Sequence, residues 1–261
     1  MTFSSGMCEL RRGDCLDLMQ KVPDGSVDMV LCDLPYGTTA CAWDAVLPFA
    51  MLWDAYRRIC KHNAAIVLTA SQPFTSALVM SNIRHFKYCW VWDKVYAANF
   101  ANANRTPLKI HEDVCVFSFG TPVYRPQKTV GEKNHTRKQY GKTKATFMVG
   151  AHVQVASDVS GMKFPKSIQR FEKHSSQCGL HPTQKPVPLM EYMIRTYTDE
   201  GDLVLDNCMG SGTTAVACAN TKRRFLGMEK DEGYFATASE RIHGFVCRNV
   251  SCIPLQTELL T

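Results

Sequence analysis

A carboxylate, a proline turn and an exposed aromatic ring follow one another in the segment Asp33-Leu34-Pro35-Tyr36-Gly37. The segment comes directly after the apolar run Val27 to Cys32, which is typical of a buried strand. In open α/β sheets, ligands bind beyond the carboxyl ends of the strands. The Asp33 carboxylate and the Pro35 carbonyl could accept the two N–H donors of an aromatic amine, while Tyr36 stacks on its ring. The segment therefore indicates a site for a planar base with an amino group, the alternative being a structural turn.

A second segment has the character of a cofactor loop. The apolar run Leu203 to Asp206 leads into a turn with two glycines and then into a predicted helix. Glycines let a ligand approach the backbone, and the amide groups of a helix N-terminus can meet it. No lysine follows the glycines, so the segment is neither a phosphate-binding loop nor a complete dinucleotide fingerprint. The expected cofactor contacts are Asp206, Gly210, Ser211, Gly212, Thr213 and Thr214.

An acid follows this loop at a suggestive spacing. Glu229 ends the next apolar run, and an acid about 20 residues beyond such a loop binds the ribose hydroxyl pair in related folds. The alternative is that the loop is an ordinary connection between a strand and a helix and that Glu229 is a surface acid.

The elements that must position these residues alternate along the chain. Apolar runs predict strands at 27–32, 64–69, 88–92, 113–119, 202–206 and 224–228. Helical patterns predict helices at 47–60, 73–83, 187–197, 213–220 and 234–242. Such alternation is typical of an α/β fold with a mostly parallel sheet and helices on both faces.

Positive charge is concentrated in one segment that interrupts this alternation. Residues 121–180 hold 11 Lys or Arg and 3 Asp or Glu, a net of +8, so the rest of the chain sums to −2 within the total of +6. We therefore expect a catalytic half at 1–120, an inserted basic region at 121–180 and a cofactor-binding half at 181–261. The insertion is either a solvated loop or a surface that neutralises phosphates. Its candidate phosphate contacts, in DNA if the partner is a nucleic acid, are Lys128, Arg137 and Lys138.

Three further candidates precede the insertion. Asn102 and Arg105 lie in a polar stretch, and Asn and Arg are side chains that read base edges. A solvated loop explains that stretch equally well. Lys94 could meet a phosphate or cap the sheet.

Composition excludes several classes of protein. No run of the sequence approaches the ~18 apolar residues of a membrane span, and its start lacks the pattern of a signal peptide, so we expect a cytoplasmic protein. The 12 cysteines include no C-x-x-C pair and several sit in apolar runs, which indicates reduced, buried thiols. The histidines and cysteines are not clustered at ligand spacing, so we expect no metal site.

Several motifs together resemble those of β-group amino-methylating DNA methyltransferases. Asp33 to Tyr36 resembles the D-P-P-Y motif, with Leu in its second position. Asp206 to Thr214 resembles the D-x-x-x-G-S-G-T-T loop, His181 to Pro186 the element before that loop, and Gly13-Asp14-Cys15 a G-D-C element. The order of catalytic motif, variable basic region and cofactor motif is that of the β group.

This resemblance implies a Rossmann-like fold that binds S-adenosylmethionine and acts on double-stranded DNA, with residues 121–180 as a target-recognition region. Family members are often homodimers. The resemblance places Asp33, Pro35 and Tyr36 at the catalytic centre. Besides the loop, it assigns cofactor contacts to Asp14, Asp33, His181, Thr183, Lys185, Pro186 and Glu229.

The target base follows from the first residue of the catalytic motif. In this family Asp usually accompanies adenine and Ser usually accompanies cytosine, so Asp33 favours adenine N6, with cytosine N4 as the alternative. The chain has no Pro-Cys pair, which argues against methylation of cytosine C5. A base inside a duplex must be extruded before it can react. An RNA or small-molecule methyltransferase and an inactive nucleic-acid-binding protein are the other hypotheses.

Overall fold

The computed structural model describes residues 2–5, 7–37, 44–98, 100–131, 162–172 and 184–250, with side chains between residues 7 and 244. The chain divides into a main unit, which combines Met1–Arg125 with Ser167–Thr261, and a smaller unit, Pro126–Lys166. In the smaller unit β7 (Thr129–Val130) pairs antiparallel with β8 (Met162–Lys163). These limits differ from the predicted insertion at 121–180, because residues 121–125 and the segment from residue 167 onward belong to the main unit.

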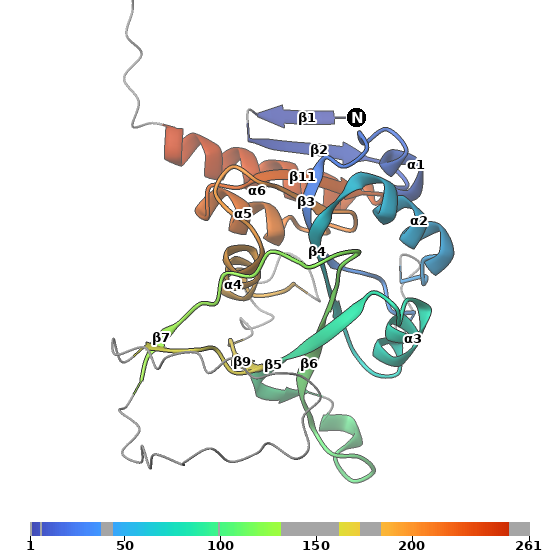
Figure 1. Ribbon diagram of the computed structural model, residues 1–261, viewed down its shortest axis with the longest axis vertical. Helices are drawn as coiled ribbons and strands as arrows, with labels where there is room; N and C mark the ends of the chain where they lie inside the picture. The colour runs from blue at the N-terminus through green and yellow to red at the C-terminus, as the bar shows by residue number, and fades with distance from the viewer. Residues whose placement is uncertain are drawn as a thin grey trace, which may run out of the picture. The chain divides into compact units, whose positions relative to one another are not determined.

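The main unit is built on a nine-stranded sheet in the order β1-β2-β11-β10-β3-β4-β6-β5-β9 (Figure 1). Neighbouring strands from β2 to β4 pair in parallel, as predicted, whereas β4, β6 and β5 pair antiparallel. The strands are β1 (Thr2–Ser5), β2 (Cys8–Arg12), β3 (Val27–Asp33), β4 (Cys60–Ala70), β5 (Phe86–Ala98), β6 (Lys109–Phe117), β9 (Ile168–Arg170), β10 (Leu203–Asp206) and β11 (Arg224–Glu229).

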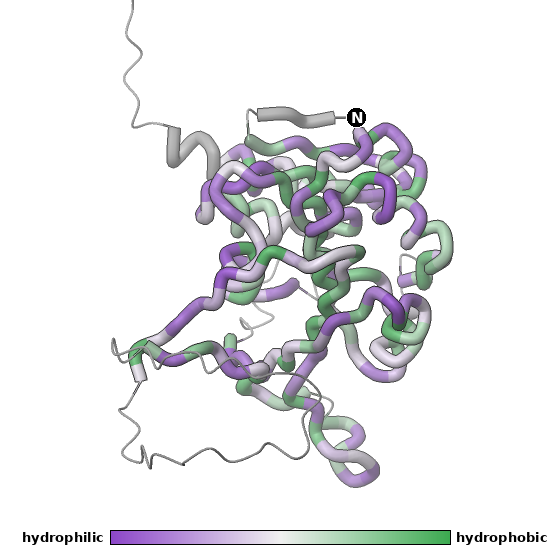
Figure 2. Tube along the Cα trace, viewed as in Figure 1, coloured by the Kyte–Doolittle hydropathy of each residue, from purple (hydrophilic) through white to green (hydrophobic). Residues whose placement is uncertain are grey.

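Helices cover both faces of this sheet because the central strands are apolar on both sides. Successive side chains of a strand point to opposite faces; on β3, Met29 and Leu31 join one core and Val30 and Cys32 the other. Figure 2 shows the hydrophobic segments concentrated in the middle of the molecule. One core receives α1 (Cys15–Met19), α2 (Phe49–Ile59) and α3 (Phe74–Ser81), and the other receives α4 (Val187–Tyr197), α5 (Thr213–Asn220) and α6 (Glu232–Val250).

Most predicted elements are present, with differences at their ends. Helices α4 and α5 begin and end at the predicted residues. Helix α6 and strand β5 are longer than predicted. The sequence interpretation missed β1, β2 and α1, whose short and partly polar segments carry little periodic signal. None of the helices in the described part of the chain combines the length and apolar character that a membrane span requires.

Candidate active site

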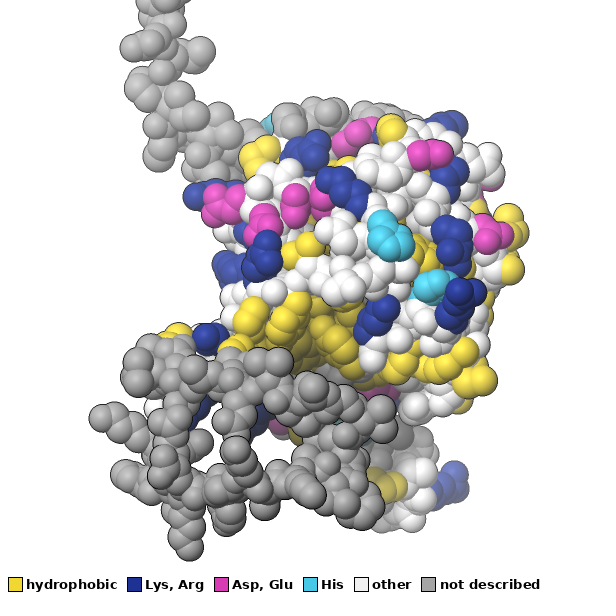
Figure 3. All heavy atoms as spheres, viewed as in Figure 1, with side chains coloured by type: hydrophobic (Ala, Val, Ile, Leu, Met, Phe, Trp, Pro, Cys, Tyr) yellow, Lys and Arg dark blue, Asp and Glu magenta, His cyan; other side chains and the backbone are white. Residues whose placement is uncertain are grey.

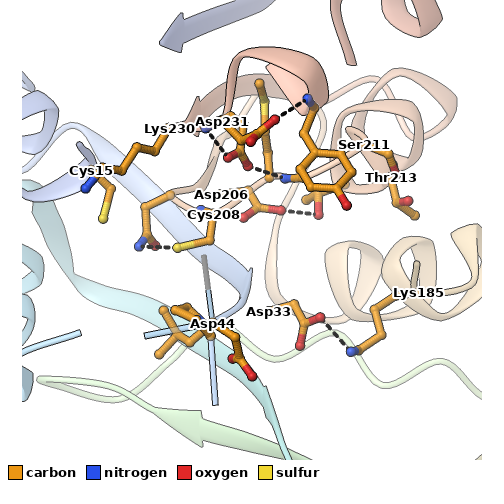
Figure 4. Close-up of a pocket in the computed structure, with 18 of the residues that line it drawn as sticks. Cys15, Asp33, Asp44, Lys185, Asp206, Cys208, Ser211, Thr213, Lys230 and Asp231 are labelled. Atoms are coloured by element: carbon orange, nitrogen blue, oxygen red, sulfur yellow. Dashed lines mark hydrogen bonds and ion pairs between the residues drawn. The ribbon is translucent and has the colours of Figure 1, made fainter. Parts of the chain in front are cut away.

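The carboxyl ends of three neighbouring parallel strands bring three acids to one edge of the sheet. Strand β3 ends at Asp33, β10 at Asp206 and β11 at Glu229. A cavity of about 630 Å³ opens at this edge, and all three acids line it. Figure 4 labels Asp33 and Asp206 among its lining residues. This volume lies within the range of roughly 300–1,000 Å³ that is typical of small-molecule sites. The two segments that the sequence singled out therefore meet at one cavity.

Two glycines shape the loop between β10 and α5. Gly210 (φ 50°) and Gly212 (φ 76°) lie in the left-handed region, which glycine enters without steric cost. A Cβ atom at Gly212 would lie 3.2 Å from the Cβ of Ala238 on α6, so the packing of α6 also favours glycine there. The buried residues Ser211, Thr213 and Thr214 line the cavity beside these glycines.

Two carboxylates hold this loop. Asp206 accepts hydrogen bonds from the Cys208 backbone N–H (3.1 Å) and the Thr214 hydroxyl (2.6 Å), and Glu229 accepts one from the Gly210 backbone N–H (2.9 Å). Burial raises the pKa of Asp206 to about 7, and it also raises the pKa of Glu229. A bound cation would stabilise the ionised form of either acid, because opposite charge offsets the cost of burial.

Asp33 is the most heavily bonded residue of the turn after β3. Its Oδ1 accepts hydrogen bonds from the hydroxyl groups of Tyr36 (2.7 Å) and Thr69, and its Oδ2 accepts one from Lys185 Nζ (2.6 Å). A carboxylate offers about four acceptor positions. Because these donors occupy three of them, Asp33 can accept one further N–H donor from a ligand.

Tyr36 is half-buried, which corrects the expectation of an exposed ring. One face of the ring stacks on Phe74, with centroids 4.9 Å apart and planes at 25°. A base could therefore stack only on the opposite face. Pro35 and Tyr36 both line the cavity.

Asp44, which lies eight residues after Tyr36 in the chain, holds the same turn by hydrogen bonds. Its Oδ1 accepts hydrogen bonds from the backbone N–H groups of Tyr36 (2.7 Å) and Gly37 (2.9 Å), and its side chain is buried. The sequence interpretation did not assign Asp44 to the site, since nothing in the local pattern indicates which backbone groups a distant carboxylate meets.

We expect Asp44→Ala to lower the free energy of unfolding by about 1–3 kcal/mol, because two backbone donors lose their shared acceptor. Asp44→Asn should cost less, since its amide oxygen can still accept both hydrogen bonds. Urea unfolding followed by circular dichroism measures the difference. Asp54→Ala on α2 is the matched control, because Asp54 is exposed and surface changes usually stay within about 0.5 kcal/mol. Equal stability of the Asp44→Ala variant and the parent protein would contradict this role.

Three further side chains of alternating charge connect Asp33 to the antiparallel part of the sheet. Lys185 Nζ lies 2.6 Å from Asp33 Oδ2 and 3.3 Å from Glu112 Oε2, and Lys94 Nζ donates to Glu112 Oε1 at 3.1 Å. Both lysines are 7% exposed. Burial alone would lower the pKa of Lys185, but Asp33 and Glu112 outweigh it and raise the pKa. We call Asp33, Lys185, Glu112 and Lys94 the charge chain.

The charge chain changes the interpretation of two predicted residues. Lys94 does not present a surface ammonium group to a phosphate, because its side chain is buried against Glu112. Lys185 lines the cavity, but its ion pairs are with Asp33 and Glu112. Glu112 was missed because the predicted strand began one residue later, at Asp113.

The remaining predicted residues are distributed as follows. Asp14 lines the cavity and caps α1 by accepting a hydrogen bond from the Leu16 backbone N–H (3.0 Å). Pro186 occupies the N-cap position of α4 without a side-chain hydrogen bond. Asn102 and Arg105 are exposed between β5 and β6. In the smaller unit, Lys128 Nζ lies 4.5 Å from the centre of the Phe164 ring. Four predicted residues lie outside the described part of the chain: Arg137, Lys138, His181 and Thr183.

The charge of the cavity indicates which kind of cofactor fits it. Eight carboxylates and two lysines line it: Asp14, Asp33, Asp44, Glu112, Asp206, Glu229, Asp231 and Glu232 against Lys185 and Lys230. Such a lining favours a cationic ligand and disfavours one that carries phosphate groups. Among the described residues, no group of three or more His, Cys, Asp or Glu is arranged to hold a metal ion.

Comparisons with known proteins agree with this chemistry. Residues 27–240 match the family model for N6 and N4 methyltransferases, described as DNA methylase. The chain is 25% identical over 263 residues to the Type II methyltransferase M1.MboII of Moraxella bovis, which covers 88% of this chain and 95% of the relative. It is also 25% identical over 266 residues to the Type II methyltransferase M.BglII of Bacillus subtilis, covering 90% and 69%.

Two solved structures share the fold. The complex of M1.HpyAVI with S-adenosylmethionine superposes with a TM-score of 0.62 at 24% identity, covering 90% of this chain and 99% of the other. The cytosine-N4-specific PvuII DNA methyltransferase superposes with a TM-score of 0.63 at 17% identity, covering 95% and 94%.

Proposed function

Because the chain belongs to the DNA methylase family of N6 and N4 methyltransferases, we propose that it methylates the N6 amino group of adenine in DNA. The observation that carries this proposal is the acceptor position left on Asp33, at the edge of an acid-lined cavity. The choice of adenine over cytosine rests on Asp33 as the first residue of the catalytic turn.

S-adenosylmethionine is the cofactor, and it supplies a methyl group activated by the positive charge of its sulfonium. The cavity fits this cation in charge and in size. We propose that Glu229 binds the ribose hydroxyls and that the loop from Asp206 to Thr214 holds the rest of the molecule, with Asp14 and Pro186 at its border. The predicted contacts His181 and Thr183 stay predictions, as does a homodimeric assembly.

The catalytic turn would activate a weak nucleophile. The lone pair of an aromatic amine is delocalised into its ring, so the nitrogen reacts poorly until its N–H groups are held. The free acceptor position of Asp33 and the Pro35 carbonyl would hold these two donors, while the face of Tyr36 opposite Phe74, near Lys185 Nζ, stacks on the ring. Asp33 acts as an acceptor and not as a strong base, because the amine proton becomes acidic only after the nitrogen has gained the methyl group.

The target base must leave the DNA duplex to enter this cavity. Extrusion costs a few kcal/mol of pairing and stacking, and contacts to phosphates can compensate for it. We propose that the basic residues of the segment 121–180 make these contacts, Lys128, Arg137 and Lys138 among them, and that Asn102 and Arg105 contact bases.

Product analysis tests the proposal. We expect incubation with labelled S-adenosylmethionine and mixed-sequence duplex DNA, followed by digestion to nucleosides, to place the label in N6-methyl-2′-deoxyadenosine. Label in N4-methyl-2′-deoxycytidine would show that Asp33 does not select adenine, while the family and the chemistry stand. Absence of label in any nucleoside, under conditions where the cofactor raises the melting temperature, would contradict the proposed function.

We expect cofactor binding to strengthen as the pH rises from 6 to 8. Asp206 has a pKa of about 7, so at pH 6 most molecules must release its proton before the carboxylate can stabilise a cation. The dissociation constant should therefore fall by roughly 10-fold across this range and level off above the pKa. Isothermal titration calorimetry measures it. In Asp206→Asn, which cannot ionise, this pH dependence should be absent, and an unchanged slope in that variant would assign the titration to another group.

A further inference from the structure

Strands β5 and β6 extend beyond the sheet at the edge that carries the active site. The last paired residues of β4 and β6 are Ala70 and Asp113, whereas the pairing of β6 with β5 continues to Lys109 and Ala98. Figure 1 shows the two strands running past β4 to the short helix η1 (Phe100–Asn102). We call residues 92–112 the arm.

The root of the arm is part of the active site. Trp92 and Glu112 are paired across β5 and β6, and both line the cavity. Glu112 and Lys94 belong to the charge chain that ends at Asp33. The position of the arm is therefore fixed relative to the catalytic carboxylate by buried ion pairs within the main unit.

The free end of the arm presents aromatic rings to solvent. Tyr96 is 65% exposed and Phe100 is 68% exposed, and both are large hydrophobic side chains. Their exposure at one projecting end of the sheet makes this end a candidate binding surface. Figure 3 shows hydrophobic and basic side chains together on the lower part of the described surface.

The charge of the arm fits an anionic partner. No Asp or Glu occurs between Asp93 and Glu112, whereas Arg105, Lys109 and His111 lie in that stretch. Arg105 is exposed. Aromatic rings combined with positive charge are the features with which proteins stack on bases and neutralise phosphates.

The backbone of the arm is strained where it presents Tyr96. Val95 has a φ of 71°, an unfavourable conformation for a β-branched residue. Asp93 Oδ1 accepts a hydrogen bond from the Val95 backbone N–H (2.8 Å). The regular register of β5 with β6 is interrupted between Asp93 and Ala98. Such strain persists where the surrounding structure imposes it, often at functional sites. Because of this irregular backbone, the Tyr96 side chain need not follow the regular alternation of side chains along the strand.

We propose that the arm inserts Tyr96 and Phe100 into the base stack of duplex DNA beside the extruded target base, an inference that rests on the proposed function. A strand advances about 3.3 Å per residue, so Tyr96 lies up to ~13 Å beyond the cavity-lining Trp92. This upper limit exceeds the depth of the major groove, about 8.5 Å, and leaves room for the shortening that the left-handed Val95 introduces. The ring can therefore occupy the stack while the extruded base lies in the cavity.

The test compares two DNA substrates. One is a duplex that the parent protein methylates, and the other is the same duplex with a mismatch opposite the methylated base, which already weakens its pairing and stacking. We expect Tyr96→Ala/Phe100→Ala to lower kcat/KM on the paired duplex by roughly 10-fold or more. On the mismatched duplex the loss should be under about 3-fold. Tyr96→Phe/Phe100→Tyr, which keeps both rings, should retain the parent activity on both substrates.

Controls separate this inference from the proposed function. Met51→Ala, an exposed position on α2, should match the parent protein. All variants should show the parent's cofactor-induced rise in melting temperature. If the alanine double variant methylates both duplexes like the parent, or loses activity on both equally, the inference is wrong. A change in oligomeric state of this variant with intact DNA kinetics would assign the rings to a contact between copies of the chain, which also overturns it. Failure of the parent protein to methylate DNA would instead contradict the proposed function.

Discussion

Asp33→Asn is expected to lower the single-turnover rate of DNA methylation by about 100- to 1,000-fold, the usual cost of losing one well-placed polar group in an active site. Asn keeps the shape and one acceptor oxygen, which can still serve Tyr36 and Thr69. Its NH₂ group would then point at Lys185 Nζ, where the carboxylate now accepts. A donor would replace the acceptor that the target amine requires.

Cofactor binding distinguishes this effect from general damage. Asp206 and Glu229 hold the loop independently of Asp33, so the dissociation constant for S-adenosylmethionine should change by less than about 10-fold, or 1.4 kcal/mol. Asp54→Asn, at an exposed position of α2, is the control. A rate for Asp33→Asn within 10-fold of the parent would show that Asp33 does not hold the amine.

Lys185→Met should lower the free energy of unfolding by about 3–5 kcal/mol and should also reduce methylation by at least 100-fold. Removal of one partner from a buried ion pair leaves an uncompensated charge, which is the costly case, and here two carboxylates lose their shared ammonium. Chemical unfolding measures the first effect, and single-turnover kinetics measure the second.

Two further measurements test this explanation. In the parent protein burial would raise the pKa of Glu112, but Lys185 and Lys94 outweigh it and lower the pKa. Without Lys185 the pKa should rise, so the native state binds a proton more readily and the stability deficit should shrink as the pH falls. Lys185→Met/Glu112→Gln removes the excess negative charge, although Lys94 then lacks its carboxylate partner. It should regain part of the stability but not the activity. Recovery of activity together with stability would show that Lys185 has only a structural role.

The sequence predicted those elements of the fold whose positions depend on the local periodicity of apolar residues. Helix α4 buries Leu189, Met190, Met193 and Ile194 at helical spacing, and its bounds match the prediction. The apolar runs also placed Asp33 and Asp206 at the carboxyl ends of predicted strands, where ligands bind in open α/β sheets.

The contacts between elements that complete the site could not be predicted from periodicity. Asp44 binds the backbone of a turn, Phe74 covers one face of Tyr36, and Glu112 joins two lysines that lie far apart in the chain. Each contact depends on how elements pack, and periodicity specifies which face of an element is buried but not what it meets. Lys94 was misinterpreted for the same reason, since a lysine at the end of a strand resembles a surface residue until its partner is known.

The charge chain also limits how this protein can evolve. Its members come from β3, β5, β6 and the segment before α4, and none can lose its charge without leaving one excess charge among the other three. A single substitution would lower fitness, whereas a paired one can be neutral. In homologues that keep Asp33, we therefore expect the residues at positions 94, 112 and 185 to be retained together or to change in compensating pairs.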